Sequence, residues 1–208
     1  MRTALRILRG WLDRDERLDL RIGVNVSARQ VRDAGLPARM ADWLAEFGIE
    51  PARVVLELTE SVMLDEADDA IEVMQRLHEL GLRFAVDDFG TGYSSLAYLR
   101  RLPVDMVKTD RAFVVCELGR DAASADLVRA VIEMARSLRL DVVAEGVEHP
   151  EQRDLLEEMG CGFAQGYLFS RPVSAEVPPP HLLDGQRRPQ GPAHGPGPAG
   201  QGEARRAG

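Results

Sequence analysis

The stretch RFAVDDFGTGYSSLAY, residues 83 to 98, places two adjacent carboxylates at the end of a buried strand. Residues 84–86 form an apolar run of strand length, Asp87 and Asp88 follow it, and a glycine-bearing loop comes next. Because neighbouring strand residues point to opposite faces, we expect Asp87 to point into an enclosed site and Asp88 to lie at its exit. The two side chains could then help to bind two metal ions at the end of this one strand. A solvated turn is the alternative interpretation of such an Asp-Asp pair.

Five further apolar runs of strand length lie on either side of this stretch. They cover residues 20–26, 54–58, 104–107, 140–144 and 162–164. Helical spacing or helix-end signals predict helices over residues 3–16, 36–47, 66–80, 93–101, 122–138 and 150–159. The chain therefore opens inside a helix, and strands alternate with helices six times.

This order predicts an α/β protein with a parallel sheet, and no Rossmann-type glycine motif follows the first strand. Each of the six strands ends in polar residues: Asn25; Glu57; Asp87 with Asp88; Lys108 with Asp110; Glu145; and Gln165. An open sheet gathers its ligands between two strands, whereas a barrel gathers them from all strand ends. We therefore expect a TIM-type (β/α)8 barrel.

The barrel should be incomplete, with about six of its eight strands. A complete one takes about 250 residues, and the folded region here is expected to span residues 1–176. The missing strands would precede Met1. They would leave two sheet edges open, which predicts poor stability or pairing with another chain.

Composition excludes several classes of function. The formal net charge is -8 and no basic stripe is present, which argues against a nucleic-acid polymer as partner. No run of 18 apolar residues occurs in this chain, so no membrane segment is expected. Cys116 and Cys161 have no metal-ligand spacing, which predicts reduced thiols and a cytoplasmic location. Residues 177–208 are rich in proline and glycine and are expected to form a disordered tail.

One amide oxygen and several carboxylates at a single barrel mouth would repel one another unless cations were bound there. Oxygen ligands select hard ions, so Mg²⁺ or Mn²⁺ is expected. Lys108 has two interpretations: a structural ion pair, or a cation that orients water and stabilises charge on a phosphoryl group.

Six motifs of the chain resemble, in order and in spacing, the EAL domain of bacterial cyclic di-GMP signalling. They are VNVSARQ at 24–30, ELTES at 57–61, DDFGTGYSSL at 87–96, KTD at 108–110, AEGVE at 144–148 and QGY at 165–167. The resemblance covers about residues 4–173 and implies a modified (β/α)8 barrel. It also implies a metal-dependent phosphodiesterase that hydrolyses cyclic di-GMP to linear pGpG.

The resemblance also implies residue roles. Asn25, Glu57 and Asp87 would hold one ion, and Asp87, Asp88 and Glu145 would serve the second ion and the attacking water. Lys108 and Asp110 would position that water, Glu145 would be the candidate base, and Gln165 would contact the guanine or a nearby part of the substrate. Glu60 would anchor the loop from Phe89 to Ser95, near a possible homodimer contact. A longer parent protein could carry GGDEF or sensor domains.

Two departures from the family pattern are visible. Thr109 stands where the family usually has isoleucine, and the Glu-Ala-Leu signature strand is absent from this chain. With that strand goes one carboxylate ligand of the first ion. Three readings therefore stay open: an active phosphodiesterase domain, a cyclic di-GMP-binding or protein-interaction module without turnover, and a truncated fragment without function.

Overall fold

Six parallel strands form one curved sheet in the order β1-β2-β3-β4-β5-β6. The structure is a computed structural model that describes residues 1–15, 18–60, 68–90, 99–115 and 122–175. The strands are β1 (Ile22–Asn25), β2 (Val54–Thr59), β3 (Arg83–Phe89), β4 (Met106–Thr109), β5 (Asp141–Glu145) and β6 (Phe163–Gln165). Each strand pairs with its neighbour in the sequence, which is the topology of a barrel wall.

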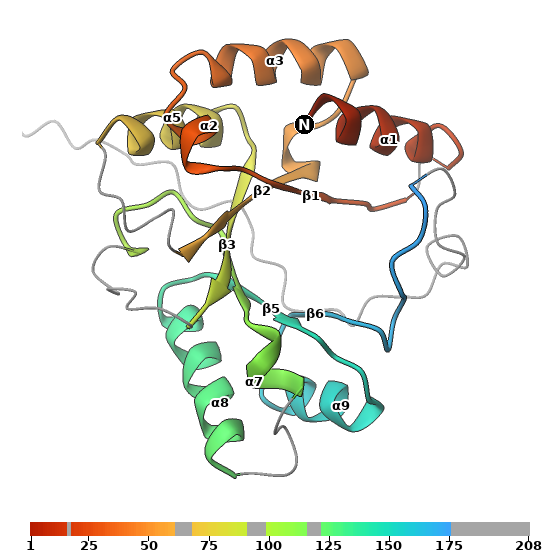
Figure 1. Cartoon of the computed structure of the whole chain (residues 1–208), viewed down its shortest axis with the longest axis vertical. Coiled ribbons are helices and arrows are strands. Elements are labelled where there is room, and N and C mark those ends of the chain that lie inside the picture. Colours follow the sequence, from red (N-terminus) through yellow and green to blue (C-terminus); the bar gives the residue numbers. More distant parts are fainter. Residues whose placement is uncertain (16–17, 61–67, 91–98, 116–121, 176–208) are drawn as a thin grey trace, which may run out of the picture.

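The helices lie outside the arc of strands (Figure 1). They are α1 (Arg2–Leu12), α2 (Ala28–Val31), α3 (Leu36–Phe47), the 3₁₀ helix η1 (Pro51–Arg53), α5 (Asp68–Glu79), α7 (Arg111–Val115), α8 (Ala122–Ser137) and α9 (Pro150–Glu158). Helices α1, α3 and α5 lie beside the β1–β3 end of the sheet, and α8 and α9 lie beside the β4–β6 end (Figure 1).

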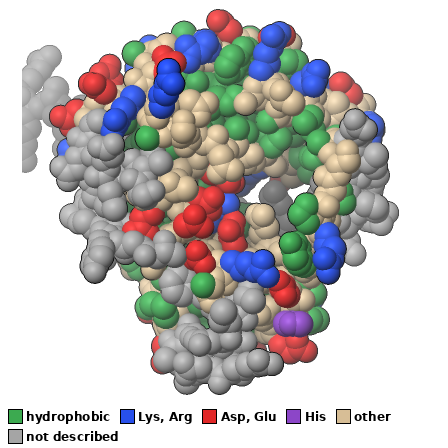
Figure 2. Space-filling model, in the orientation of Figure 1, with side chains coloured by type: hydrophobic (Ala, Val, Ile, Leu, Met, Phe, Trp, Pro, Cys, Tyr) green, Lys and Arg blue, Asp and Glu red, His purple; other side chains and the backbone are tan. Residues whose placement is uncertain are grey.

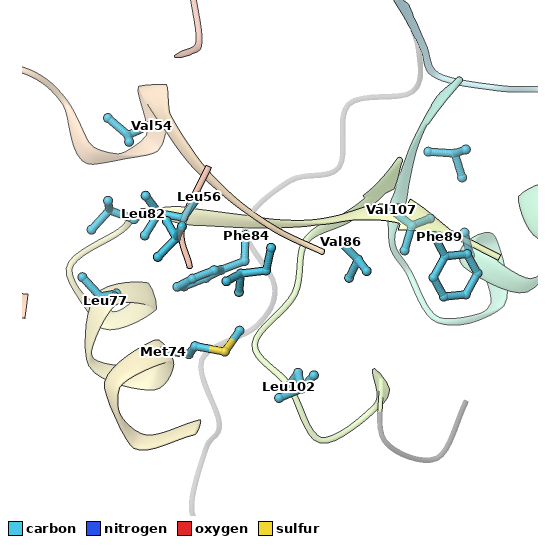
Figure 3. Packing of buried hydrophobic residues seen from close by; sticks show 14 of the residues in the cluster. Val54, Leu56, Met74, Leu77, Leu82, Phe84, Val86, Phe89, Leu102 and Val107 are labelled. Carbon is cyan, nitrogen blue, oxygen red and sulfur yellow. The ribbon is translucent and has the colours of Figure 1, made fainter. Parts of the chain in front are cut away.

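The two faces of the sheet carry different residues because side chains alternate along a strand. The outer face holds the main core, in which Leu56, Phe84 and Val86 pack with Met74 and Leu77 of α5 (Figure 3). The inner face holds a small separate cluster, made of Val55, Ala85, Met106 and Val143. This cluster is one layer of side chains inside the half-barrel, directly below the predicted site.

Strands β1 and β6 form the two ends of the described sheet. They are more exposed than the four strands between them, which are mostly buried. The segment after β6 returns to the first helix, where the indole Nε1 of Trp11 donates a hydrogen bond of 3.1 Å to the carbonyl oxygen of Ala175. The fold is therefore a half-barrel of six parallel strands, as the sequence predicts.

The strand boundaries differ from the prediction by one to three residues, and two of these differences affect the site. The fourth strand begins at Met106 rather than at residue 104, so Lys108 lies within β4 and not beyond its end. The third strand continues past Asp87 to Phe89, because pairing with β4 resumes there after a bulge. The short helices α2, η1 and α7 were not predicted, since one turn of helix carries no detectable apolar period.

Several predictions fall outside the described residues. These are the start of the helix over residues 66–80, most of the helix over residues 93–101, Cys116 and the tail over residues 177–208. Within the described part, no helix is both long and apolar enough to cross a membrane.

Candidate active site at the carboxyl ends of the strands

Strand register brings the predicted residues to one face and one edge of the sheet. Asn25 pairs with Glu57, Thr59 pairs with Asp87, and Glu145 pairs with Gln165. Lys108 pairs with Val143, two residues before Glu145, so its side chain shares the inner face with theirs. Figure 2 shows acidic side chains gathered beside a hollow in the surface. The ends of β2, β3, β4 and β5 therefore supply side chains that meet at one place, and Asn25 and Gln165 lie on the same face at the two ends of the described sheet.

Three carboxylates converge on the ammonium group of Lys108. Its Nζ lies 2.7 Å from Oε1 of Glu145, 3.0 Å from Oδ1 of Asp87 and 3.1 Å from Oε2 of Glu57. The Lys108 side chain is 8% exposed, and the three carboxylate side chains are 17–21% exposed. An ammonium group has three N–H donors, so Lys108 orients three acids from neighbouring strands, while its single positive charge offsets only one of their three negative charges.

The pKa values of Lys108 and Glu145 reflect this arrangement. Burial would lower the pKa of Lys108, but the hydrogen bonds and charges of the surrounding carboxylates outweigh burial and raise it well above its usual value. Burial raises the pKa of Glu145, and the hydrogen bond from Lys108 offsets only part of that increase. Lys108 is therefore charged at neutral pH, and Glu145 is a better proton acceptor than an ordinary glutamate.

Asp87 and Asp88 lie in a bulge of β3, where these two residues face one residue of β4, Lys108. Asp88 adopts the left-handed backbone region, with φ 55°. Burial raises the pKa of Asp88, the charges of Asp87 and Asp110 raise it further, and Lys108 lowers it. The charged groups of the site therefore act on Asp88, which lies at the rim of the site.

Asp110 and Glu60 each bind backbone near the site. Oδ1 of Asp110 accepts a hydrogen bond of 2.6 Å from the N–H of Ala112, at the start of α7. Glu60 is 4% exposed, and its Oε2 accepts a 3.0 Å hydrogen bond from the N–H of Gly90. This contact lies at the beginning of the loop that Glu60 is expected to anchor, and the rest of that loop lies outside the described residues.

The chain is similar to proteins of one known family. The model of the EAL domain family matches residues 1–172. The chain belongs to the EAL domain family. It is 42% identical over 173 residues to the bifunctional diguanylate cyclase/cyclic di-GMP phosphodiesterase MucR of Pseudomonas aeruginosa, a match that covers 83% of this chain and 25% of MucR. It is 44% identical over 174 residues to the cyclic di-GMP phosphodiesterase NbdA of the same species, covering 83% and 22%. The EAL chain thus spans about a quarter of the length of these curated relatives.

Solved structures show the same relationship. A complex of the PaMucR phosphodiesterase with c-di-GMP superposes with a TM-score of 0.77 at 42% identity, over 84% of this chain and 70% of that chain. Klebsiella pneumoniae BlrP1 in a manganese/cyclic di-GMP complex gives a TM-score of 0.71 at 31% identity, over 80% and 42%. A calcium/cyclic di-GMP complex of BlrP1 also matches, with a TM-score of 0.74 at 29% identity, over 85% and 44%. A divalent metal ion accompanies cyclic di-GMP in the two BlrP1 complexes.

The oxygen donors of the EAL site fit a hard divalent cation in their chemistry. Glu57, Asp87 and Glu145 offer carboxylates and Asn25 an amide oxygen, the ligands that Mg²⁺ and Mn²⁺ prefer. In this structure the three carboxylates point toward Lys108. Within the described ranges, no three acidic, histidine or cysteine side chains are grouped in a way that could hold a metal ion. The donor set is suitable, but the carboxylates would have to turn toward an ion.

The sequence analysis missed three residues of the site and its supports. Gly23 lies below Asn25 on β1, and a Cβ at this position would meet Oε1 of Glu57 at 2.1 Å, so glycine leaves room for that carboxylate. Arg111 pairs with Glu148 at 2.6 Å and joins the segments after β4 and β5. Arg111 directly follows the KTD motif and Glu148 is the last residue of the AEGVE motif, but nothing in the sequence indicates that the two side chains pair.

Proposed function

We propose that this chain is the larger part of a metal-dependent cyclic di-GMP phosphodiesterase domain that hydrolyses its substrate to linear pGpG. The observation that carries the proposal is the convergence of Glu57, Asp87 and Glu145 on Lys108, at the carboxyl ends of four EAL strands. The cyclic di-GMP phosphodiesterase activity for which MucR and NbdA are named supports the same assignment.

Each residue has a proposed role. Asn25, Glu57, Asp87, Asp88 and Glu145 would hold Mg²⁺ or Mn²⁺. Such a cation would supply Lewis-acid activation of water and neutralise charge on the phosphate.

Side chains of the protein would transfer the proton, stabilise charge on the phosphate and contact the substrate. Glu145, with its raised pKa, would accept the proton of the attacking water. Lys108 would stabilise the charge that develops on the phosphoryl oxygens. Asp110 would act indirectly, because one of its oxygens already binds the N-terminal turn of α7. Gln165, at the end of β6, would contact a guanine base.

Assembly and location are also proposals. One proposal is a homodimer that forms through the loop from Phe89 to Ser95. Another is that GGDEF or sensor domains in a longer protein link this domain to a signalling pathway. The cytoplasm is the proposed location. Residues 177–208 are proposed to form a disordered tail outside the folded unit of residues 1–176.

The decisive assay is incubation of the purified protein with cyclic di-GMP and Mn²⁺ or Mg²⁺, followed by chromatography for pGpG. Formation of pGpG supports the phosphodiesterase. Tight binding without pGpG would favour the binding module, and neither binding nor product would favour the fragment.

Asp87→Asn is the first variant to test. Asp87 is one of the three acids on Lys108, and the substitution removes its charge while keeping its shape. We expect at least a hundredfold loss of pGpG formation, the usual scale for a metal ligand or its close support. Asp141→Asn, at the other end of the strands, is the control with an equal charge change. Undiminished turnover in Asp87→Asn would overturn the assignment.

A further inference from the structure

Lys108 is the only lysine of the chain, since all the other Lys and Arg residues are arginine. The difference matters chemically. Arginine presents a planar fork of donors, whereas the lysine ammonium is a compact charge whose three donors can be shared among three acceptors. In this structure the three acceptors are Glu57, Asp87 and Glu145, and each lies on a different strand.

These same carboxylates are the ones that the proposed function gives to a divalent cation. An oxygen that points at the ammonium at 2.7–3.1 Å is committed to a hydrogen bond. Each of these carboxylates keeps a second oxygen, but a cation bound by the three acids would lie within a few ångströms of the ammonium, and the two positive charges would repel each other. The absence of any metal-like grouping of these acids among the described residues agrees with their commitment to Lys108.

We propose that Lys108 is a built-in competitor of the cation for this site. When Lys108 holds the three carboxylates, it keeps the strand ends together against their mutual repulsion. When a cation takes them, Lys108 gives up contacts and its ammonium turns toward the substrate phosphate. The binding of the cation is then coupled to the movement of the Lys108 ammonium toward the substrate. This inference rests on the proposed function, because that function supplies the cation.

The first test compares the Mn²⁺ dissociation constants of the wild type and Lys108→Met by calorimetry, without substrate. Removing the competing charge is expected to tighten Mn²⁺ binding at least about tenfold, while the same protein loses stability in the presence of a chelator. Arg129→Met removes an equal charge from an exposed position on α8 and is the matched control, expected to bind Mn²⁺ as the wild type does. Equal or weaker binding by Lys108→Met would overturn the competition.

The second test needs no variant, which guards against misfolding of Lys108→Met. Protein labelled with isotopic nitrogen only in lysine gives a single side-chain ammonium signal in NMR spectra. We expect this signal to be protected in the presence of a chelator and to lose its protection as Mg²⁺ saturates the site. A signal that stays unchanged at saturating Mg²⁺ would overturn the inference. Failure of the wild type and of Lys108→Met to bind Mn²⁺ would overturn the metal site itself, and the inference with it. Absence of pGpG alone would leave both binding results standing.

Discussion

At the scale of single residues, the site is a balance of opposite charges rather than a row of acids. Lys108 offsets one of the three negative charges of Glu57, Asp87 and Glu145. The pKa of the neighbouring Asp88 is raised by burial and by the charges of Asp87 and Asp110. Thr109, the neighbour of Lys108 on β4, is buried on the opposite face, and among the described residues no partner reaches its Oγ1. Asp88 and Thr109 therefore each destabilise the folded protein slightly, and a substitution should remove that effect.

Asp88→Asn is expected to stabilise the protein in a pH-dependent way. A raised carboxyl pKa means that the folded state disfavours the charged form, so this group favours folding at low pH and loses that contribution as pH rises through its folded pKa. The variant should be more stable than the wild type at pH 7 by up to about 0.5 kcal/mol, the scale for an exposed charge. The difference should vanish below the ordinary aspartate pKa of about 4.

The measurement is urea unfolding in the presence of a chelator at both pH values. Asparagine tolerates the left-handed backbone of this position, so strain should not change. Asp69→Asn, on α5, is the control. A stabilisation of equal size at both pH values would contradict the electrostatic explanation.

Thr109→Val is expected to raise the free energy of unfolding by about 1 kcal/mol. Valine has nearly the shape of threonine, and the change removes a buried hydroxyl whose desolvation costs about 1–3 kcal/mol when no partner compensates it. Urea unfolding at pH 7 measures the difference. Thr109→Ser keeps the hydroxyl and loses the methyl group, so it should destabilise. If Thr109→Val were less stable than the wild type, the hydroxyl must have a partner.

At the scale of the elements, the segments that follow β4 and β5 are joined beside the site. Gln152 is 5% exposed and sits in the first turn of α9. Its Oε1 accepts hydrogen bonds from the N–H groups of Glu148 and His149, and its Nε2 donates to the carbonyl oxygen of Val114 in α7. One side chain thus caps α9 and holds α7 against it, close to the strands that carry Lys108 and Glu145.

Gln152→Leu is expected to destabilise the protein by about 3 kcal/mol. The change keeps the side-chain volume but removes three hydrogen bonds of a buried group, each worth about 1 kcal/mol. Thermal and urea unfolding give the size, and hydrogen exchange should show the loss concentrated in α7 and at the start of α9. Gln30→Leu is the matched control, because Gln30 forms a similar capping box in α2 but is exposed. A loss as small as that of the control would contradict a joining role for Gln152.

At the scale of the whole molecule, the half-barrel leaves the strands β1 and β6 at the ends of the described sheet. Four of the exposed large apolar residues follow one another closely at the β6 end: Phe163, Tyr167, Phe169 and Val173. An open strand edge beside exposed apolar side chains favours pairing with another chain. The arrangement therefore predicts self-association.

The apparent molecular mass is expected to rise with protein concentration, from tens to hundreds of micromolar. Light scattering after size exclusion measures it. Phe163→Glu places a charge on β6 and should shift the equilibrium toward monomer. Leu127→Glu is the control, because Leu127 is also exposed but lies on α8. A wild type that stays monomeric throughout, or an equal effect of both variants, would contradict association through this edge.

The sequence by itself determined the six strands, their order and the polar residue at the end of each, because buried parallel strands read as apolar runs and their ends interrupt those runs. It also determined the family, through six motifs in register. Tertiary structure alone decided that Glu57, Asp87 and Glu145 share the ammonium of Lys108, because such contacts depend on sheet register and on the β3 bulge. The joining roles of Gln152 and Arg111 were likewise invisible, since their partners lie on segments far apart in the chain that only folding brings together.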